Sequence, residues 1–337
     1  MALGEAPAAV ATTAPTQGRP AWSGPWRRFA VRRAGRLLGS LWVLVSASFL
    51  MIHLIPGDPV RTSLGPTASA DLVAARRAEL GLDDPFLVQY WHFVQGLFTG
   101  DLGTSLSLRL PVQEVIAQRL PATLSLAVLG FVVAVAIAVP LGVGVGALTR
   151  RGRGRRTELG FTTTSVVLGL VPDFLLGVAL VYVFGVGLGW LPVAGDNTPS
   201  AYVLPALSLA VGPAAVLARI VRVEMVAVLE ADFVRTARAK RLPSRTVYLR
   251  HALPNALTAS LTLGGMLLGS MVAGTVLVEN VFAWPGLGST IVSSILAKDY
   301  PLVQAIVIVY GVGVLIVNTA VDVALALIDP RSMIRED

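Results

Sequence analysis

The residue types that carry most enzyme chemistry are scarce in this 337-residue sequence. It contains no cysteine, which excludes disulfides, thiolate metal sites and cysteine nucleophiles. Its three histidines, His53, His92 and His251, are widely separated, and no H-E-x-x-H motif pairs any of them. No G-x-S-x-G nucleophile motif occurs either. The sequence therefore predicts a chain that is not an enzyme and that holds neither a cofactor nor a metal.

The sequence also lacks the G-x-x-x-x-G-K-[ST] motif that cradles nucleotide phosphates. Gly142, Gly144 and Gly146 resemble a glycine-rich nucleotide turn, but they lie in an apolar segment with no predicted strand before them. Glycines in this setting favour close packing between helices instead. If the protein depends on ATP and Mg²⁺, partner subunits must bind them.

Two acidic residues lie within apolar segments, where an ionised side chain costs roughly 2.5 to 3.5 kcal/mol. Pro172 and Asp173 interrupt one apolar run near its middle. Asp173 is expected either to line a pore and meet a positive group of a substrate, or to cap a helix that restarts after the proline. Asp322 lies near the end of the last run, where a hydrogen bond to another helix is the better interpretation.

The composition indicates a membrane protein. Hydrophobic residues make up 54% of the chain and charged residues 14%, against roughly 25% charged residues in an ordinary soluble domain. Six apolar runs are long enough to cross about 30 Å of hydrocarbon as helices. These runs are 37–55, 122–148, 159–190, 203–221, 254–278 and 301–328. The predicted fold is an all-α polytopic membrane protein with six transmembrane helices.

The distribution of arginine predicts the orientation. The 150–156 loop holds five arginines, and 219–250 holds eight Lys or Arg residues against three acids. The alternate loops 191–202 and 279–300 contain one basic residue between them, Lys298. The positive-inside rule therefore predicts that both termini are cytoplasmic. The terminal segments are predicted to be a disordered tail (1–20), a basic cytoplasmic segment (21–36) and a cytoplasmic C-terminal tail (329–337).

The 56–121 insertion is predicted to be extracytoplasmic and helical. A short helix is expected over 69–82, and Asp83-Asp84-Pro85 is typical of the start of a second one. The second helix has a broad aromatic face that includes Tyr90 and Trp91. We expect this face to pack against the ends of the spans or to lie at the lipid headgroups, in preference to forming a ligand pocket.

The 279–288 stretch of the outer loop 279–300 is too short to span a membrane and is broken by proline and glycine. Irregular backbone at membrane depth is tolerated only where protein or a water-filled cavity covers it, so this stretch is predicted to dip towards a pore mouth. The candidate pore or gate residues are Pro172, Asp173, Glu279, Phe282, Trp284, Pro285 and Gly286.

The basic stretch 230–254 is predicted to form a knob on the cytoplasmic side, with coupling helices over 230–251. Residues 230–240 favour a helix, Leu242-Pro243-Ser244 breaks it, and a second helix resumes before Pro254 opens the fifth span. Two short basic helices at an angle make a surface that another protein could grip. A solvated positive loop is the alternative.

Several short motifs occur in order along nearly the whole chain. They are LIPGDP at 54–59, LGLD at 80–83, GDLGTS at 100–105, PATL at 121–124, which is expected to open the second span, LGWLPVAG at 188–195, FAWPGLG at 282–288 and DPR at 329–331. In this order and spacing, the motifs resemble the inner-membrane permeases of binding-protein-dependent ABC importers. The similarity is to the peptide and nickel branch, which includes the dipeptide and oligopeptide permease B subunits.

That family's cytoplasmic signature is an E-A-A triplet, a Gly after three further residues, and a Leu-Pro whose proline is thirteen residues beyond the Gly. Counted back from Leu253-Pro254, the triplet falls on Arg235-Thr236-Ala237 and the glycine on Arg241. Arg235 resembles the peptide branch, whereas Arg241 departs from the pattern. Where that position needs a positive φ, a non-Gly residue costs on the order of 1 kcal/mol unless the turn relaxes or Pro243 reshapes it. Asp173 is a second departure, because permeases of this family more often have a small polar residue at that position.

The resemblance implies a bacterial inner-membrane complex with a second homologous permease, two cytoplasmic ATPases and an extracytoplasmic substrate-binding protein. It implies import of di- or oligopeptides, with a nickel chelate, haem or glutathione as alternatives. The residues expected to couple to the ATPases are Arg235, Thr236, Ala237, Lys240, Arg241, Leu242, His251 and Pro254. The residues expected to dock the binding protein are Gly57, Asp58, Pro59, Tyr90, Trp91 and Asp101.

Other functions have less support in the sequence. An ion-coupled secondary transporter would need an inverted repeat and paired intramembrane acids, and no convincing repeat is present. An intramembrane enzyme would need a nucleophile and a base at recognisable spacing. The 27 basic residues, of which only Lys240 and Lys298 are lysine, cluster beside the apolar runs, so they predict membrane topology and no nucleic-acid partner.

Overall fold

The computed structural model describes residues 25–54, 59–65, 67–79, 81–152 and 154–328. These residues form helices and loops, with one isolated β-bridge between Thr104 and Pro111. The predicted all-α fold is confirmed. The predictions for 1–20, for the first residues of 21–36, for 329–337 and for Gly57 and Asp58 lie outside the described residues.

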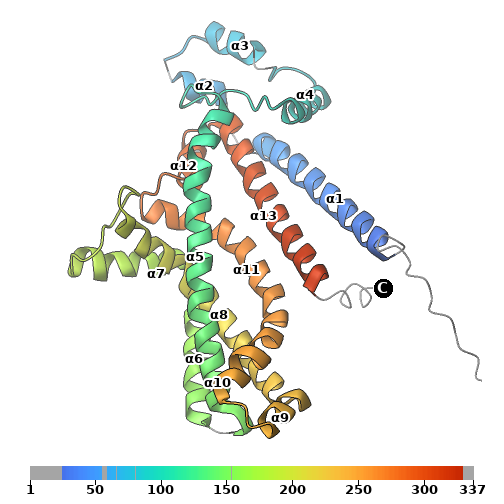
Figure 1. The fold of residues 1–337 in the computed structure, drawn as a ribbon. Coiled ribbons are helices and arrows are strands. Elements are labelled where there is room, and N and C mark those ends of the chain that lie inside the picture. Colours follow the sequence, from blue (N-terminus) through green and yellow to red (C-terminus); the bar gives the residue numbers. More distant parts are fainter. Residues whose placement is uncertain (1–24, 55–58, 66, 80, 153, 329–337) are drawn as a thin grey trace, which may run out of the picture.

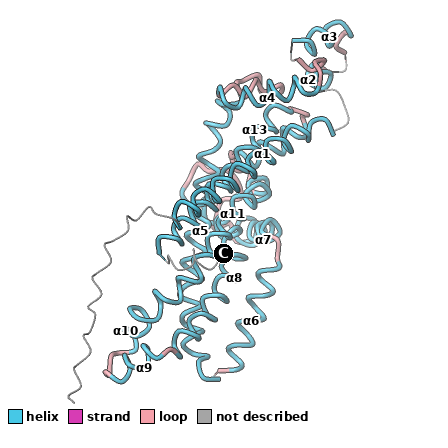
Figure 2. Tube along the Cα trace, turned by 90° about the vertical axis from the view of Figure 1, so that its right-hand side faces the viewer, coloured by secondary structure: helices cyan, strands magenta, loops and turns pink. Residues whose placement is uncertain are grey.

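Short helices lie at the two opposite ends of a bundle of long ones (Figure 1). One end carries α2 (Pro59–Leu64), α3 (Ala70–Glu79) and α4 (Phe86–Thr99), and the other carries α9 (Asp232–Ala239) and α10 (Ser244–Thr246). Figure 2 shows the same separation after a quarter turn. These regions are called the α4 end and the α9 end below.

Five continuous helices are long and apolar enough to cross a membrane. They are α1 (Pro25–Leu54), α5 (Val112–Thr149), α8 (Val203–Glu230), α11 (Leu253–Val281) and α13 (Tyr300–Ile328). A sixth crossing is the bent pair formed by α6 (Arg155–Leu170) and the helix made of α7 (Asp173–Leu180) and the π-helix η2 (Val181–Gly187). With this pair counted as one span, the predicted six spans are confirmed.

The third span, expected over 159–190 with an interruption at Pro172 and Asp173, is bent at that point. Its two halves meet at 96°. Pro172 has no backbone N–H and restricts the residue before it to extended conformations, and Val171 has φ −72° and ψ 123°. The proline therefore ends α6 and lets α7 leave in a new direction.

Several helices extend beyond the apolar runs that predict them. The structure joins residues 25–36 of the basic segment to the first span in α1, starts α5 at Val112, and continues α8 to Glu230. Helix α5 also runs through Pro121, which was expected to open the second span, and through Pro140. Hydropathy marks the part of a helix that suits hydrocarbon, but the hydrogen-bonded backbone continues into the polar turns beyond it.

Helices α5 and α8 pack along much of their length through small residues. Their shared cluster consists of Ala134, Ala138, Ala210, Ala214, Leu217, Ala218 and Val221. A Cβ added at Gly142 of α5 would lie 2.6 Å from Val221 Cβ and 2.7 Å from the Ala218 carbonyl oxygen. Gly142 and Gly146 thus permit close helix contact, as the sequence predicts, whereas a Cβ at Gly144 would meet nothing within 4 Å.

Helix α1 lies at the edge of the bundle, where it contacts α13 and α4 (Figure 1). An ion pair between Arg33 of α1 and Asp322 of α13 joins these two helices. Asp322 therefore links two helices, as expected, although its partner is a charged side chain and its bond is an ion pair.

We predict that Gly142→Ala weakens the α5–α8 contact by about 1 to 3 kcal/mol, because the added methyl group has no space. Thermal unfolding of the detergent-solubilised protein measures this as a lower midpoint. Gly144→Ala is the matched control, since a Cβ there meets nothing within 4 Å. The control should be neutral or slightly stabilising because alanine favours helix. Equal shifts of the unfolding midpoint in the two variants would contradict close packing of α8 against Gly142.

Candidate functional site

A single buried carboxylate joins three helices near the α4 end. Glu279, in the last turn of α11, is fully buried. Its Oε1 accepts a hydrogen bond from Thr123 Oγ1 of α5 at 2.7 Å. Its Oε2 accepts bonds from the backbone N–H groups of Gly288 at 2.7 Å and Ser289 at 3.1 Å. These N–H groups belong to the first turn of α12 (Leu287–Leu296), where a helix has no partners of its own and favours a negative charge.

Gly286 and Gly288 allow the backbone to approach this carboxylate closely. The Leu287 N–H donates to Thr123 Oγ1 at 2.8 Å, so both α11 and α5 supply acceptors to α12. A Cβ at Gly286 would collide with the Glu279 carboxylate, and one at Gly288 would lie 2.6 Å from the Val276 Cα. The proline-glycine sequence of this turn is therefore explained by the space that the buried acid requires.

The aromatic residues of the same turn are fully buried. Trp284 donates from Nε1 to the Ala122 carbonyl oxygen at 3.0 Å and meets the Tyr202 ring edge-on at 4.5 Å. Phe282 packs against α7, because a Cβ at Gly177 would lie 3.1 Å from its ring. The predicted gate residues Glu279, Phe282, Trp284 and Gly286 thus come together in one packed unit, with Pro285 half-buried beside them.

This arrangement corrects the expectation of an irregular loop over 279–288. Residues 279–281 belong to α11, and α12 occupies much of the 279–300 segment. The turn between the two helices is short, with Ala283 at φ 46°. Helix α12 can begin at once because Glu279 and Thr123 satisfy its first N–H groups.

A second buried carboxylate, which sequence reasoning missed, lies at the start of α13. Asp299 Oδ2 accepts hydrogen bonds from Ser105 Oγ at 2.5 Å, Ser107 Oγ at 2.6 Å and the Ser107 N–H at 2.9 Å. These contacts tie the loop after α4 to α13. The acid directly before Tyr300-Pro301 is a recognisable helix-start signal, but its serine partners are too distant in sequence to be inferred.

Asp173 is the first residue of α7 and is half-buried. Its backbone carbonyl accepts a hydrogen bond from Ser208 Oγ at 2.5 Å. Within the described residues its carboxylate makes no hydrogen bond or ion pair, so the capping alternative gains no support from a side-chain bond. The carboxylate oxygens face Gly212 of α8 and Gly274 of α11, where an added Cβ would lie 3.3 Å and 3.2 Å away. Two glycines thus leave room for this acid among three helices.

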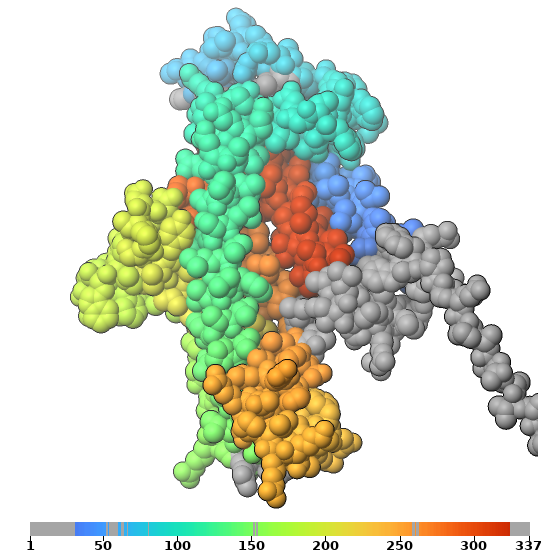
Figure 3. Space-filling view, in the orientation of Figure 1, coloured from blue at the N-terminus to red at the C-terminus, as the bar shows by residue number. Residues whose placement is uncertain are grey.

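The α9 end forms a bent segment, residues 231–254, that packs onto the ends of α8 and α11 and is called the elbow below. Helix α8 ends at Glu230, and Ala231 is extended with ψ 151°, so α9 starts at Asp232 and not at Glu230 as expected. Val234 and Ala237 of α9 are buried in one cluster with Met225, Leu229, Val247, Ala252 and Ala256. In Figure 3 this region, gold and orange, protrudes from the end of the bundle.

Arg241 occupies the turn position that the family signature assigns to glycine. Its φ is 56°, its N–H bonds the Arg238 carbonyl oxygen at 2.9 Å, and the Leu242 N–H bonds the Ala237 carbonyl oxygen at 3.3 Å. This is the Schellman pattern of a helix end, with Pro243 following it. The position does need a positive φ and the turn has not relaxed, so Arg241 carries a local strain on the order of 1 kcal/mol.

The structure brings the predicted coupling residues together on the elbow. Arg235, Thr236, Lys240, Arg241, Leu242 and Pro254 are exposed, His251 is half-buried and Ala237 is buried. The chain returns to α11 through α10 and the π-helix η4 (Val247–Ala252). Sequence reasoning missed Phe233 and Leu249, two exposed apolar side chains on this surface. The sequence pattern that could have identified them is their position close to Val234 and Val247. Because those two residues are buried, Phe233 and Leu249 face outward.

The predicted docking residues are dispersed over the α4 end. Tyr90 packs against α1, where its hydroxyl lies 2.9 Å from Ser46 Oγ. Trp91 and Asp101 are exposed, and the Asp101 carboxylate accepts a bond from the Gly103 N–H at 3.0 Å. Pro59 is the first residue of α2.

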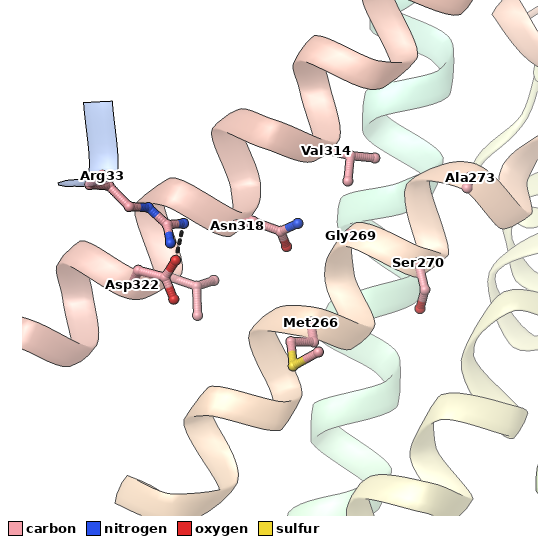
Figure 4. A pocket seen from close by; sticks show the side chains of 9 residues that line it. Arg33, Met266, Gly269, Ser270, Ala273, Val314, Asn318 and Asp322 are labelled. Carbon is pink, nitrogen blue, oxygen red and sulfur yellow. Dashed lines mark ion pairs between the residues drawn. The ribbon is translucent and has the colours of Figure 1, made fainter. Parts of the chain in front are cut away.

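A cavity of about 480 Å³ lies among α1, α11 and α13, with the Arg33–Asp322 ion pair at its edge (Figure 4). Its other lining residues are Met266, Gly269, Ser270, Ala273, Val314, Asn318 and Val321. None of the predicted coupling or gate residues lines this cavity.

Comparison with known proteins identifies the architecture. Residues 138–334 match the family described as "Binding-protein-dependent transport system inner membrane component", and residues 26–127 match the N-terminal model of the corresponding membrane component. The chain belongs to this family. It is an ABC importer permease and a multi-pass protein of the cytoplasmic membrane, as the sequence motifs predict.

Curated relatives and a solved structure agree with this family. The permease is 39% identical over 302 residues to the glutathione transport system permease protein GsiC of Salmonella typhimurium, covering 90% of this chain and 97% of that protein. It is 37% identical over 303 residues to GsiC of Escherichia coli K12, with the same coverage. An inward-facing structure of the MetNI methionine ABC transporter shares the fold, with a TM-score of 0.54, 19% identity and coverage of 64% of this permease and 97% of that chain.

We predict that Glu279→Ala destabilises the permease by roughly 2 kcal/mol or more, because it leaves buried donors of α5 and α12 without an acceptor. Glu279→Gln should cost less, since one carbonyl oxygen remains. Thermal unfolding in detergent measures both, and Glu114→Ala, which removes an exposed acid, is the control. A Glu279→Ala variant as stable as the Glu114→Ala control would refute the anchoring role.

Proposed function

We propose that this permease forms half of the translocation pathway of an ATP-driven, binding-protein-dependent importer. It would pair with a second, homologous permease, receive two ATPases on the elbow at the α9 end, and meet an extracytoplasmic binding protein at the α4 end. The observation that carries this proposal is the elbow itself. Its solvent-exposed surface is basic, and its buried side chains pack against α8 and α11. The chain is non-catalytic in this proposal, and the ATPases bind ATP and Mg²⁺.

The orientation follows from the positive-inside rule. The arginine-rich 150–156 loop and the elbow lie at the same end of the bundle, so we place that end, with the N and C termini, on the cytoplasmic side. The α4 end then faces the outside, where a binding protein arrives. Asp101 and the segment around Pro59 belong to the proposed landing surface.

The elbow is suited to transmit a push as a rigid body. Val234 and Ala237 lie in one buried cluster with residues of α8 and α11, so a displacement of α9 moves both spans. Outside, the apolar Phe233, Leu242 and Leu249 lie among basic residues, which gives a partner both buried area and charge to recognise. Closure of the ATPases would thus reach the membrane through α8 and α11.

The packed unit around Glu279 supports a gate role at the opposite end of the same helix. Helix α11 begins at the elbow and ends at Glu279, which holds α12 and α5. Movement of α11 would carry Phe282 and Trp284 with it as one body. A gate built in this way opens by displacement of a helix pair and not by the swing of a free loop.

We propose short peptides as the substrate, with glutathione as the first candidate. The curated relatives are named glutathione transport system permeases, and glutathione is itself a modified tripeptide with a free amino group. Asp173, half-buried at the bend of the third span, offers a carboxylate to such a positive group. This favours a pathway role for Asp173 over a capping role.

We predict that Lys240→Glu combined with Arg241→Glu uncouples ATP hydrolysis from uptake, because both charges lie on the exposed face of the elbow. Arg241→Glu keeps a side chain at the same positive φ, so the turn itself is not relieved. The measurement is ATP hydrolysis and substrate uptake by the complex in vesicles. Arg155→Glu with Arg156→Glu is the matched control, with the same charge change at the start of α6. Unchanged uptake in the elbow variant would rule out docking there.

We predict that Asp173→Asn reduces uptake of peptides with a free, positive amino terminus more than uptake of the same peptides blocked by acetylation. The substitution keeps the size of the side chain and removes its charge. Uptake of both peptide sets by vesicles containing the whole importer provides the measurement. An identical profile for the variant and the natural protein would remove Asp173 from substrate selection.

A further inference from the structure

Helix α4 is unusual for a segment outside the spans, because its sequence FLVQYWHFVQGLFT contains no Asp, Glu, Lys or Arg. None of its residues is fully buried, so its many apolar side chains are only partly covered by the rest of the chain. At about 100° per residue, these side chains divide into distinct sectors around the helix. The sectors differ in what they contact.

One sector packs on the ends of two spans. Phe86, Tyr90 and Phe93 surround Phe49 of α1, with ring centroids 5.2 Å, 5.2 Å and 5.6 Å from it. The neighbouring residues Gly96 and Leu97 border a small cavity against the first turns of α13. Ser46 and Phe49 lie within the apolar stretch of α1 that is suited to cross the membrane. Helix α4 therefore lies across two spans at the depth where they leave the hydrocarbon.

A second sector is an exposed apolar stripe. Leu87, Trp91 and Phe98 fall on one line of the helix, about a quarter turn from the packed sector, and their exposed fractions are 76%, 65% and 88%. Helix α1, on which the packed sector lies, itself exposes Leu38, Trp42 and Leu50. Large apolar side chains are thus exposed both on the span and on the helix that packs against its end.

Next to the stripe, on the side of the helix opposite the packed sector, lies an exposed sector that contains Gln95, Val88, Thr99 and His92. Three of these four side chains are polar. An apolar stripe with an aromatic residue, a neighbouring polar sector and a position at the end of a span are the features of a helix that lies in the membrane interface.

We propose that the stripe of Leu87, Trp91 and Phe98 inserts into the headgroup and upper acyl region of the adjoining lipid leaflet, so that the partner of this surface is the bilayer. This assigns Trp91 to lipid contact and not to the binding protein. Through the contacts of Tyr90 with α1 and of Asp299 with the loop after α4, the lipid contact sets the height of the whole α4 end relative to the membrane.

Site-directed spin labelling tests this proposal, because the chain has no natural cysteine. Single variants Leu87→Cys, Trp91→Cys and Phe98→Cys are labelled in the importer reconstituted in vesicles of phosphatidylethanolamine and phosphatidylglycerol. His92→Cys and Thr99→Cys, at the two exposed residues of the polar sector that lie farthest from the stripe, are the matched controls. Collision with oxygen, which concentrates in lipid, is compared with collision with a water-soluble nickel chelate.

The proposal predicts a several-fold higher ratio of oxygen to nickel collisions at the three stripe positions than at the two controls. Equal ratios at stripe and control positions would show a stripe exposed to water and overturn the proposal. Labels at the stripe that are immobilised and shielded from both reagents would also overturn it, because a protein partner would then cover the surface. All five positions are exposed, so substitution there should leave the fold intact, which the elution volume of each variant checks.

Discussion

Hydrocarbon offers no hydrogen bonds, so every break in a membrane helix must be satisfied by the protein itself. Two breaks in this permease are closed by buried carboxylates. Glu279 and Thr123 complete the first turn of α12, and Asp299 holds two serines at the start of α13. At the bend of the third span, Ser208 bonds the Asp173 carbonyl oxygen, while the Asp173 carboxylate itself makes no such bond within the described residues. This difference is consistent with the proposed contact between Asp173 and a positive group of the substrate.

Because the breaks between helices are closed by contacts inside the protein, the bundle can move as a rigid body. Helix α11 runs unbroken from the elbow, where Ala256 lies in the buried cluster, to Glu279 at the far end. Its partner α8 is packed against α5 through alanines and glycines that leave little freedom to slide. Close-packed interiors of this kind pass a displacement along their length with little loss. The proposed ATPase surface and the proposed gate are therefore two ends of one body, which fits an importer whose energy comes from partner subunits.

Hydropathy and motif order were sufficient to predict the six spans and the family, because these depend on local composition and on short stretches of sequence. Counting back from Pro254 places Arg241 at the glycine position of the signature, but it could not show that the backbone there keeps a positive φ. The sequence could not show that Glu279 lies in the last turn of α11 and also completes the first turn of α12. Its two carboxylate oxygens accept hydrogen bonds from α5 and α12, and these contacts exist only in the folded chain. The sequence predicts an interruption at Pro172, but it could not give the angle of 96° there or the serines that bond Asp299, because these depend on how distant segments pack.

The central claim is that this permease converts the movement of partner ATPases into movement of its spans and has no energy source of its own. The most direct measurement is substrate accumulation in vesicles that contain the permease pair, with and without the ATPases and ATP. The account predicts concentrative uptake only when ATPases, ATP and binding protein are all present. Accumulation driven by a proton or sodium gradient in vesicles that contain the permease alone would contradict it.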